Sequence, residues 1–313
     1  MTRPLLTLPI GFAPLVVDKV ERLLEVLSAI REDPMLGHVF VLQGGTALNL
    51  FYDRPSRLSI DIDLMFVGAA DVGGMRAMRP EVDARFREVV VGLGYVVQGT
   101  NDEHSGQTYR VKYPGNHVKV DVSYLARIAL LEPQERTCEF ADPPIAFPVL
   151  QRPELAAGKI KALMERAAMR DLYDLYRLSV QTPALFDEPV ARALAIRAIG
   201  TADPFPAMKD PVEALERFND PASEFVEPLF AMLRSGEAPK YEVMLKAVSR
   251  WLSVLSSLSA AETEFMRLLD ENAEYRPELL LAEWPGVLEK ASRDPVMAWK
   301  VRNLSERPPN GRT

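Results

Sequence analysis

The sequence is poor in the residues that build disulfides and zinc sites. It contains one cysteine, Cys138, and three histidines, His38, His104 and His117. A single cysteine cannot form an internal disulfide, and the scattered histidines lack the spacing of zinc ligands. No stretch approaches the roughly 20 unbroken apolar residues that cross a bilayer. We therefore expect a cytoplasmic protein with no membrane partner.

The chain also lacks an excess of positive charge, because its formal net charge is −7 over 313 residues. This argues against a protein that coats nucleic acid non-specifically. A nucleic-acid substrate held by a local basic patch stays open. Residues 151–178 form such a patch, with six Lys and Arg against four Asp and Glu.

Apolar periodicity divides the chain into two parts. Residues 1–150 alternate short helices and strands, whereas strand signals nearly vanish beyond them. We predict an α+β protein with a small mixed sheet in 1–150 and a helical domain in 151–313 that completes the active-site cleft. The expected helices include 16–30, 80–93 with Pro80 in its first turn, 155–178 with a break near 166–169, 213–218, 225–233 and 241–269, followed by a disordered tail at 306–313.

Two aspartates occupy alternate positions of a predicted strand. Asp61 and Asp63 alternate with Ile60, Ile62 and Leu64, so both carboxylates point to the same side. Adjacent carboxylates repel each other, and a divalent cation with hard oxygen ligands relieves that repulsion. An Asp-x-Asp at a strand end can also be a turn or cap feature.

A third aspartate, Asp121, lies in a second alternating segment at 117–124. It would join the acidic face of a neighbouring strand. We expect Asp61, Asp63 and Asp121 to bind Mg²⁺ or Mn²⁺. In an alternative role, Asp121 is the base that acts on an attacking hydroxyl.

A double glycine precedes these aspartates. Gly44, Gly45 and Thr46 follow a short apolar strand and open a predicted helix, so their backbone N–H groups are candidates to hold phosphate. The Thr46 hydroxyl would add a contact. A tight strand-to-helix connection is the alternative. Metal ligands beside a phosphate-binding turn suggest phosphoryl or nucleotidyl transfer.

Arg57 and Ser59 lie just before the aspartates. The planar guanidinium of Arg57 suits neutralisation of a triphosphate, and a solvated surface charge is the equal alternative. We include both residues in the expected nucleotide-binding set.

The basic patch contains a further cluster of charged residues. Gly158 and Lys159 are not a Walker A loop, because Pro153 stands where the first glycine should be. Asp171 and Asp174 share a helical face. They would either pair with nearby arginines at the surface or belong to a phosphate-facing helix pair.

Four blocks in this order resemble the AbiEii-type nucleotidyltransferase toxins, which include the mycobacterial MenT group and belong to the DNA polymerase β-like superfamily. The blocks are Gly-Gly-Thr-Ala-Leu-Asn-Leu (44–50), Arg-x-Ser-x-Asp-Ile-Asp-Leu (57–64), Lys-Val-Asp (119–121), and Lys159 followed by Arg-Asp-Leu-Tyr-Asp-Leu (170–175). The match runs from about residue 39 to residue 178.

This resemblance implies a minimal nucleotidyltransferase fold followed by a helical domain. It implies a toxin of a type IV toxin–antitoxin or phage-defence system, with an AbiEi-type antitoxin encoded alongside. Relatives use nucleoside triphosphates, and some add pyrimidines, for example from CTP, to the 3′ acceptor end of tRNA, which stops growth.

The resemblance also implies roles for single residues. Many superfamily members have Gly-Ser where this chain has Gly-Thr, and the gap to Asp61 is longer here. The implied assignments are a phosphate turn at Gly45 and Thr46, metal ligands at Asp61 and Asp63, the Lys-x-Asp block at Lys119 and Asp121, a nucleotide-phosphate lysine at Lys159, and the last aspartate at Asp171.

The expected activity is magnesium-dependent transfer of a nucleoside monophosphate to a 3′-hydroxyl, with tRNA as the leading acceptor. Lys159 and Arg57 would stabilise the pyrophosphate leaving group. Two alternatives remain. One is transfer to a protein or small-molecule hydroxyl, and the other is an inactive binding module that keeps the fold.

Overall fold

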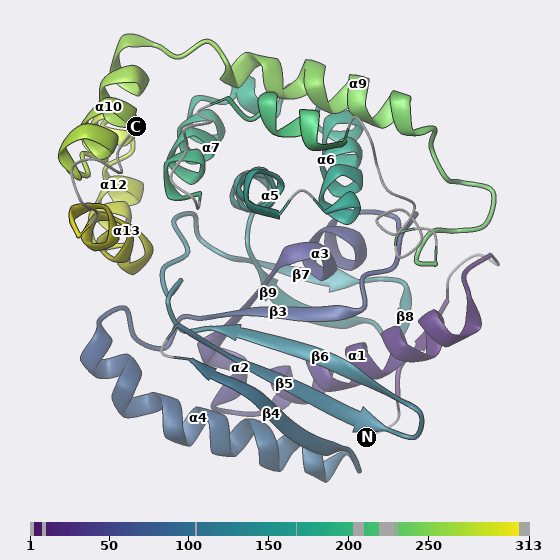
Figure 1. The fold of residues 1–313 in the computed structure, drawn as a ribbon. Coiled ribbons are helices and arrows are strands. Elements are labelled where there is room, and N and C mark those ends of the chain that lie inside the picture. The colour runs from purple at the N-terminus through teal and green to yellow at the C-terminus, as the bar shows by residue number, and fades with distance from the viewer. Residues whose placement is uncertain are drawn as a thin grey trace. The chain divides into compact units, whose positions relative to one another are not determined.

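The computed structural model describes residues 3–7, 11–103, 105–166, 168–202, 210–218, 229 and 231–306. The chain divides into two units (Figure 1): residues 1–151 with 230–238, and residues 152–229 with 239–313. The predicted domain boundary after residue 150 lies beside this division. The return of 230–238 to the first unit was not predicted. A mixed sheet with helices, followed by a helical part, confirms the expected α+β class.

A seven-stranded mixed sheet forms the centre of the first unit, in the order β4-β5-β6-β3-β2-β9-β7. The pairs β3/β6 and β2/β9 are parallel, and the other neighbours are antiparallel. The seven strands are β2 (Phe40–Gln43), β3 (Asp61–Phe66), β4 (Val96–Glu103), β5 (Gly106–Tyr113), β6 (Asn116–Ser123), β7 (Gln134–Cys138) and β9 (Ile145–Val149). A separate ribbon pairs β1 (Leu5–Leu6) with β8 (Ala141–Asp142).

Helices cover both faces of this sheet. Figure 1 shows α1, α2 and α4 on one face and α3 on the other. The bounds are α1 (Pro14–Glu32), α2 (Leu36–Val39), α3 (Gly44–Thr46), the π-helical turn η1 (Ala47–Tyr52) and α4 (Val72–Gly92). The predicted stripe of α1 is buried, since Val20, Leu23, Leu24 and Leu27 are fully inaccessible.

Helix α4 begins eight residues before its predicted start. Asp71 caps it, because its Oδ1 accepts a hydrogen bond of 2.8 Å from the Gly74 amide. Pro80 therefore lies inside the helix and not in its first turn. The sequence signal misled because proline is more frequent at helix starts than in helix interiors.

Polar contacts of Asp83 fix α4 to the sheet. Its Oδ1 accepts hydrogen bonds from the hydroxyls of Tyr109 on β5 (2.5 Å) and Tyr124 just after β6 (2.7 Å). Burial raises the pKa of both tyrosines, and the Asp83 contact raises it further. Both hydroxyls therefore stay protonated donors. They hold the strands β5 and β6 from the side of α4.

The regular elements of the second unit are all helices in its described residues. Its elements are α5 (Arg152–Arg166), α6 (Met169–Gln181), η2 (Leu185–Asp187), α7 (Pro189–Thr201), η3 (Glu213–Phe218), α9 (Tyr241–Leu252), η4 (Ser253–Leu255), α10 (Ala260–Asn272), α11 (Glu278–Leu281), α12 (Pro285–Ser292) and α13 (Pro295–Ser305). Helix α7 is buried on nearly all sides and packs against α5, α10, α11 and α13. None of the helices in the described ranges is long and apolar enough to span a membrane.

Two predictions for this unit have opposite outcomes. The break near 166–169 is confirmed, because α5 ends at Arg166 and α6 begins at Met169. The single helix at 241–269 is wrong. Helix α9 ends at Leu252, and Ser259 starts α10 through a capping box with Glu262. The apolar periodicity on both sides of the break hid this capping signal.

The return segment, residues 231–238, belongs to the first unit. Leu58 N donates to Met232 O at 2.9 Å, and Arg234 N donates to Ser56 O at 3.1 Å. Most of the predicted helix at 225–233 lies outside the described residues, as does the tail beyond 306. Of the described residues in this range, Leu229 is helical, and Met232 and Leu233 pair with the chain just before β3.

Candidate active site

The first two aspartates lie on the central strand β3. Asp61 and Asp63 are half-buried, whereas Ile62 and Leu64 between and after them are fully buried. This alternation follows from the two-residue repeat of a strand. Both carboxylates therefore leave the sheet on the same face, as the sequence pattern predicts.

Strand β6 brings the third aspartate beside them. Asp63 is in register with Asp121, and Asp61 is in register with Lys119. Residues in register on neighbouring strands point to the same face, so Asp63 and Asp121 are side by side. Lys119 Nζ contacts Asp121 Oδ2 at 2.5 Å, and the Thr108 hydroxyl donates to Asp121 Oδ1 at 2.6 Å. Asp121 is thus held in place from two directions.

The glycine turn lies directly against Asp63. Gly44 has a φ of +72°, a left-handed conformation that L side chains rarely adopt. A Cβ at this position would lie 2.1 Å from Asp63 Oδ2. The position therefore requires glycine for its backbone conformation and for the space that the carboxylate occupies.

Thr46 has a different contact from the one expected. Its side chain is fully buried, and its hydroxyl donates to the main-chain oxygen of Asp61 at 2.5 Å. The next residues form similar ties, because Asn49 Nδ2 donates to Gly45 O at 2.8 Å. The Thr46 hydroxyl therefore attaches the turn to β3. The proposed hydroxyl contact with phosphate is not supported by this geometry.

A cavity of about 360 Å³ opens on the acidic face of the sheet. Asp63, Lys119 and Asp121 line it, together with Gln43, Thr108 and residues of the β5 and β6 ends. Sequence reasoning missed Gln43 and Thr108. Their signal is positional: Gln43 immediately precedes the glycine turn and is in register with Asp63, and Thr108 is in register with Asp121.

Two basic residues, Lys19 and His117, lie near Asp61, and sequence reasoning did not include them in the site. Burial lowers the pKa of Lys19 on α1, and the nearby charge of Asp61 opposes this effect. Burial also lowers the pKa of His117 on β6, as does the charge of Lys19, while Asp61 acts in the opposite direction. Neither residue is near Asp61 in the sequence.

Arg57 and Ser59 are buried, at 2% and 6% exposure. Arg57 Nη1 donates to Leu58 O at 3.4 Å and lies 3.8 Å from the sulfur of Met232. The alternative that Arg57 is a solvated surface charge is therefore wrong. Contact with a triphosphate stays a prediction for both residues.

The acidic face is not a ready-made metal cage. Within the described ranges, no group of three or more His, Cys, Asp and Glu side chains is arranged to hold a metal ion. Asp121 contacts Lys119 and Thr108 instead. Metal binding by Asp61, Asp63 and Asp121 together stays a prediction. A magnesium ion needs only one or two carboxylates plus substrate phosphates, and Asp61 with Asp63 fits that requirement.

The Lys159 cluster forms within the second unit. Lys159 Nζ lies 3.0 Å from Asp171 Oδ1 and 2.7 Å from Asp174 Oδ2, and Arg166 Nε lies 2.7 Å from Asp171 Oδ2. The carboxylates of Asp171 and Asp174 are at most 1% exposed. They are interior ion pairs, and the alternative of weak surface pairs is wrong.

Asp171 is charged in spite of its burial. Burial alone would raise the pKa of its carboxyl, but the hydrogen bond from Arg166 and the charge of Lys159 lower it to about 2. The charged network is thus internally compensated. Roles of Lys159 and Asp171 in nucleotidyl transfer stay predictions.

Comparison with known proteins identifies the family of the chain. The family model "Nucleotidyl transferase AbiEii toxin, Type IV TA system" matches residues 25–247. Among solved structures, MenT4, a nucleotidyltransferase toxin from Mycobacterium tuberculosis H37Rv, is 19% identical with a TM-score of 0.63. The match covers 88% of this chain and 92% of that one, and at this identity it shows the fold.

Two other comparisons add little. A chain of the Escherichia coli MS115-1 CdnC:HORMA-deltaN complex is 14% identical over 89% of this chain and 92% of that one. Its TM-score of 0.27 carries no argument. No curated protein gave a significant match. The family match spans both the aspartate strands and the Lys159 cluster, and it shows that the chain belongs to the AbiEii family of nucleotidyltransferase toxins of type IV toxin–antitoxin systems.

Proposed function

We propose that the protein transfers a nucleoside monophosphate from a nucleoside triphosphate to a 3′-hydroxyl, and that the acceptor is the 3′ end of tRNA. One observation carries the proposal. Asp63 and Asp121 are in register on parallel neighbouring strands, they line one cavity, and Asp63 lies against the Gly44 turn. The proposal assigns the roles of metal ligand, base and phosphate-binding turn to these neighbouring residues.

Magnesium would be held by Asp61 and Asp63. When bound, it neutralises charge on the triphosphate and orients the α-phosphate. Both carboxylates are half-buried on one face of β3, and Mg²⁺ is commonly held by one or two carboxylates. Mn²⁺ would suit the same oxygen ligands.

Asp121 is the proposed general base. The 3′-oxygen forms a bond to the α-phosphorus, the bond to the β-phosphate oxygen breaks, and pyrophosphate leaves. The proton of the hydroxyl passes to Asp121. Thr108 and Lys119 orient this carboxylate, because each contacts a different oxygen of it.

Other residues bind the triphosphate. The backbone of Gly44 and Gly45 is the proposed phosphate-binding turn. Lys159, supported by Asp171, and Arg57 are proposed to stabilise the leaving group. For Lys159 this requires that a phosphate share the ammonium that now contacts Asp171 and Asp174.

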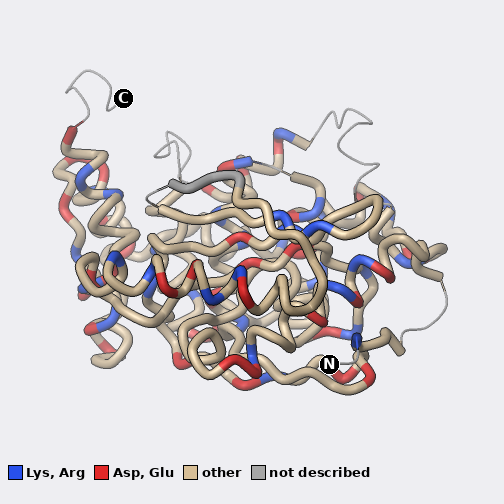
Figure 2. Tube along the Cα trace, turned by 90° about the horizontal axis from the view of Figure 1, so that it is seen from below, with Lys and Arg blue, Asp and Glu red and all other residues tan. Residues whose placement is uncertain are grey.

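The proposal also names the acceptor of the nucleoside monophosphate. The tRNA assignment, with CTP or another pyrimidine triphosphate as donor, follows from the family resemblance. The basic residues of 151–178 would contact the acceptor stem by its phosphates. Figure 2 shows acidic and basic residues interspersed along the chain. The net charge of −7 keeps a protein or small-molecule hydroxyl as the second candidate acceptor.

Labelled triphosphates test the proposal directly. Each of the four would be incubated with the protein and Mg²⁺, and with either total tRNA or lysate protein. We expect label on tRNA, reduced roughly a hundredfold or more by Asp63→Asn. The matched control is Asp142→Asn, an exposed aspartate of β8, which should match wild type. Label on protein alone would exclude tRNA, and no transfer under any condition would indicate an inactive binding module.

A further inference from the structure

A cavity of about 660 Å³ lies within the second unit, between α6, η2 and α9. The rings of Phe186 and Trp251 lie beside it with centroids 4.6 Å apart, and each residue is 6% exposed. Trp251 Nε1 donates to Thr182 O at 3.2 Å. Because this donor is satisfied internally, the aromatic pair offers the cavity an apolar floor.

The cavity is open at its sides, and we call it the groove. Its walls are apolar and accessible. Val180, Val243 and Val254 all line it and are 55%, 49% and 44% exposed. A single exposed valine is ordinary, but three around one aromatic floor form a continuous apolar patch. Val243, Ala247 and Val254 lie along one side of α9 and η4, so the patch follows a helix axis for roughly 16 Å.

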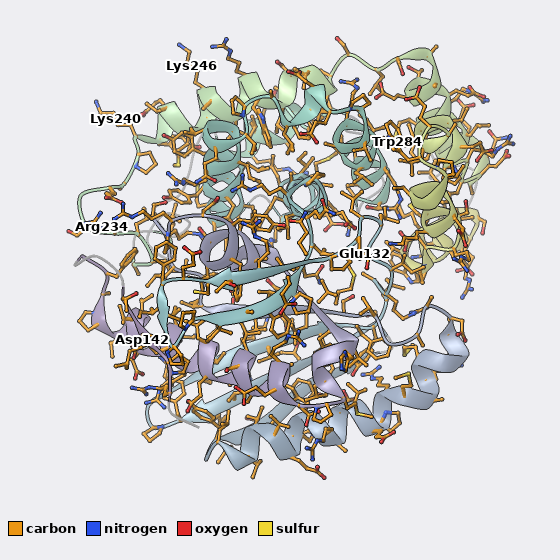
Figure 3. All side chains as sticks on the ribbon, turned by 180° about the vertical axis from the view of Figure 1, so that it is seen from behind. Glu132, Asp142, Arg234, Lys240, Lys246 and Trp284 are labelled. Atoms are coloured by element: carbon orange, nitrogen blue, oxygen red, sulfur yellow. The ribbon has the colours of Figure 1, made fainter. Side chains whose placement is uncertain are left out.

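Two cations lie next to this patch. Lys246 and Arg250 line the groove one turn apart on α9. Both are exposed, and neither forms an ion pair with any residue in the described ranges. Lys246 projects away from α9 (Figure 3). Asp187 is the acidic residue of the lining. With two cations against one acid, the lining is locally basic in a chain with net charge −7.

We propose that this groove binds an amphipathic helix of a partner protein. Apolar side chains of the helix would cover Val180, Val243 and Val254, and its acidic side chains would pair with Lys246 and Arg250. The length of the patch matches about three helical turns, which is typical of helix-in-groove recognition. A small-molecule site would enclose most of its ligand, whereas these walls are open.

The proposal is independent of nucleotidyl transfer. Every residue of the groove belongs to the second unit, and none is a proposed transfer residue. Loss of binding at the groove can therefore be measured without reference to catalysis.

Peptide selection on the full-length chain tests this inference. A display library of roughly 16-residue peptides, the length that spans the patch with a margin, would be selected on the wild type. We expect enriched sequences to carry apolar residues three and four positions apart, flanked by Asp or Glu. Affinity of an enriched peptide should fall about tenfold or more for Lys246→Glu/Arg250→Glu. The matched control is Arg302→Glu, an exposed arginine of α13, which should not change it.

Three outcomes would overturn the proposal. The first is selection without enrichment. The second is enrichment of peptides that lack acids or that bind the double variant as tightly as the wild type. The third is displacement of the enriched peptide by a fluorescent fatty acid at equal concentration, which would make the groove a site for an anionic amphiphile. Because Lys246 and Arg250 are exposed, circular dichroism of the double variant should match the wild type.

Discussion

At the scale of single residues, Gly44 occupies a position where a larger side chain does not fit. Its left-handed backbone turns β2 into α3, and the missing side chain leaves the space that the Asp63 carboxylate fills. Both properties depend on glycine, so a substitution tests the contact between the turn and the carboxylate.

Gly44→Ala should lower nucleotidyl transfer by about a hundredfold, because the Cβ displaces Asp63 by an ångström or more. It should also lower the free energy of unfolding by about 1–2 kcal/mol through left-handed strain. Gly115→Ala is the control, since Gly115 has a φ of +80° and no neighbour within 4 Å of a Cβ. It should show similar strain with full activity. Equal activity of both variants would contradict the packing of Gly44 against Asp63.

The contribution of Asp171 to the free energy of unfolding depends on pH. Its ordinary pKa is 3.8, and the folded protein lowers it to about 2. The folded state therefore binds the proton less tightly, so this contribution is complete above the unfolded pKa and is lost as the pH falls from about 4 to about 2. We expect the loss to reach about 1 kcal/mol at pH 3 and about 2 kcal/mol at pH 2.

Arg166→Gln tests this linkage, because it removes the hydrogen bond that lowers the pKa of Asp171. Urea unfolding at pH 5 and pH 3 should show the wild type more stable than the variant, by a margin that shrinks at pH 3. Arg293→Gln removes only an exposed pair with Glu289 and should give a small margin at both pH values. A margin for Arg166→Gln that is the same at both pH values would contradict the lowered pKa.

The sequence pattern predicted where the site carboxylates lie better than it predicted the contacts of the residues around them. The period of two on β3 and β6 predicted that Asp61, Asp63 and Asp121 share a face, because alternation is a local property. The contacts of Thr46 and Arg57 could not be predicted in this way. The first depends on how closely the turn approaches β3, and the second on a segment 175 residues away in the sequence.

At the scale of elements, helix α4 contains an exposed proline in its interior. Pro80 lacks the amide that would complete the helical ladder. Pro80→Ala should raise the free energy of unfolding by about 1–3 kcal/mol, because it restores a hydrogen bond without removing buried contacts. Pro285→Ala is the control at the first position of α12, where no such bond is missing, and should be nearly neutral. Chemical denaturation measures the free energy of unfolding of both variants. A lower value for Pro80→Ala than for the wild type would contradict the prediction and show that Pro80 stabilises the helix.

The boundary of an element could be predicted where its signal, such as a cap or a helix break, lies in the neighbouring residues. The break between α5 and α6 was visible, but the start of α4 depended on weighing Asp71 against Pro80. The strands β7 and β9 were not predicted, because they are short and β9 contains Pro148. Strand β9 also pairs with β2, which lies far from it in the sequence, and period alone does not identify that partner.

At the scale of the whole molecule, the first unit is not continuous in sequence. The return segment covers the chain before β3, where Leu58 is fully buried and Arg57 is nearly so. A fragment of residues 1–151 should therefore be less stable than the same fragment with residues 230–238 appended through a flexible linker. Urea unfolding would measure the difference in the free energy of unfolding. We expect about 1–3 kcal/mol, from two or more hydrogen bonds and the apolar surface that the return segment buries. Equal stability would contradict a structural role for the return segment.

The same discontinuity has a consequence for synthesis of the protein. A ribosome delivers the chain from its N-terminus, so the strands bearing the aspartates emerge long before Met232 and Leu233 are made. Until then the backbone groups of Ser56 and Leu58 that pair with the return segment lack these partners. The first unit can therefore reach its final form only after residues 152–229, about half of the second unit, have been translated.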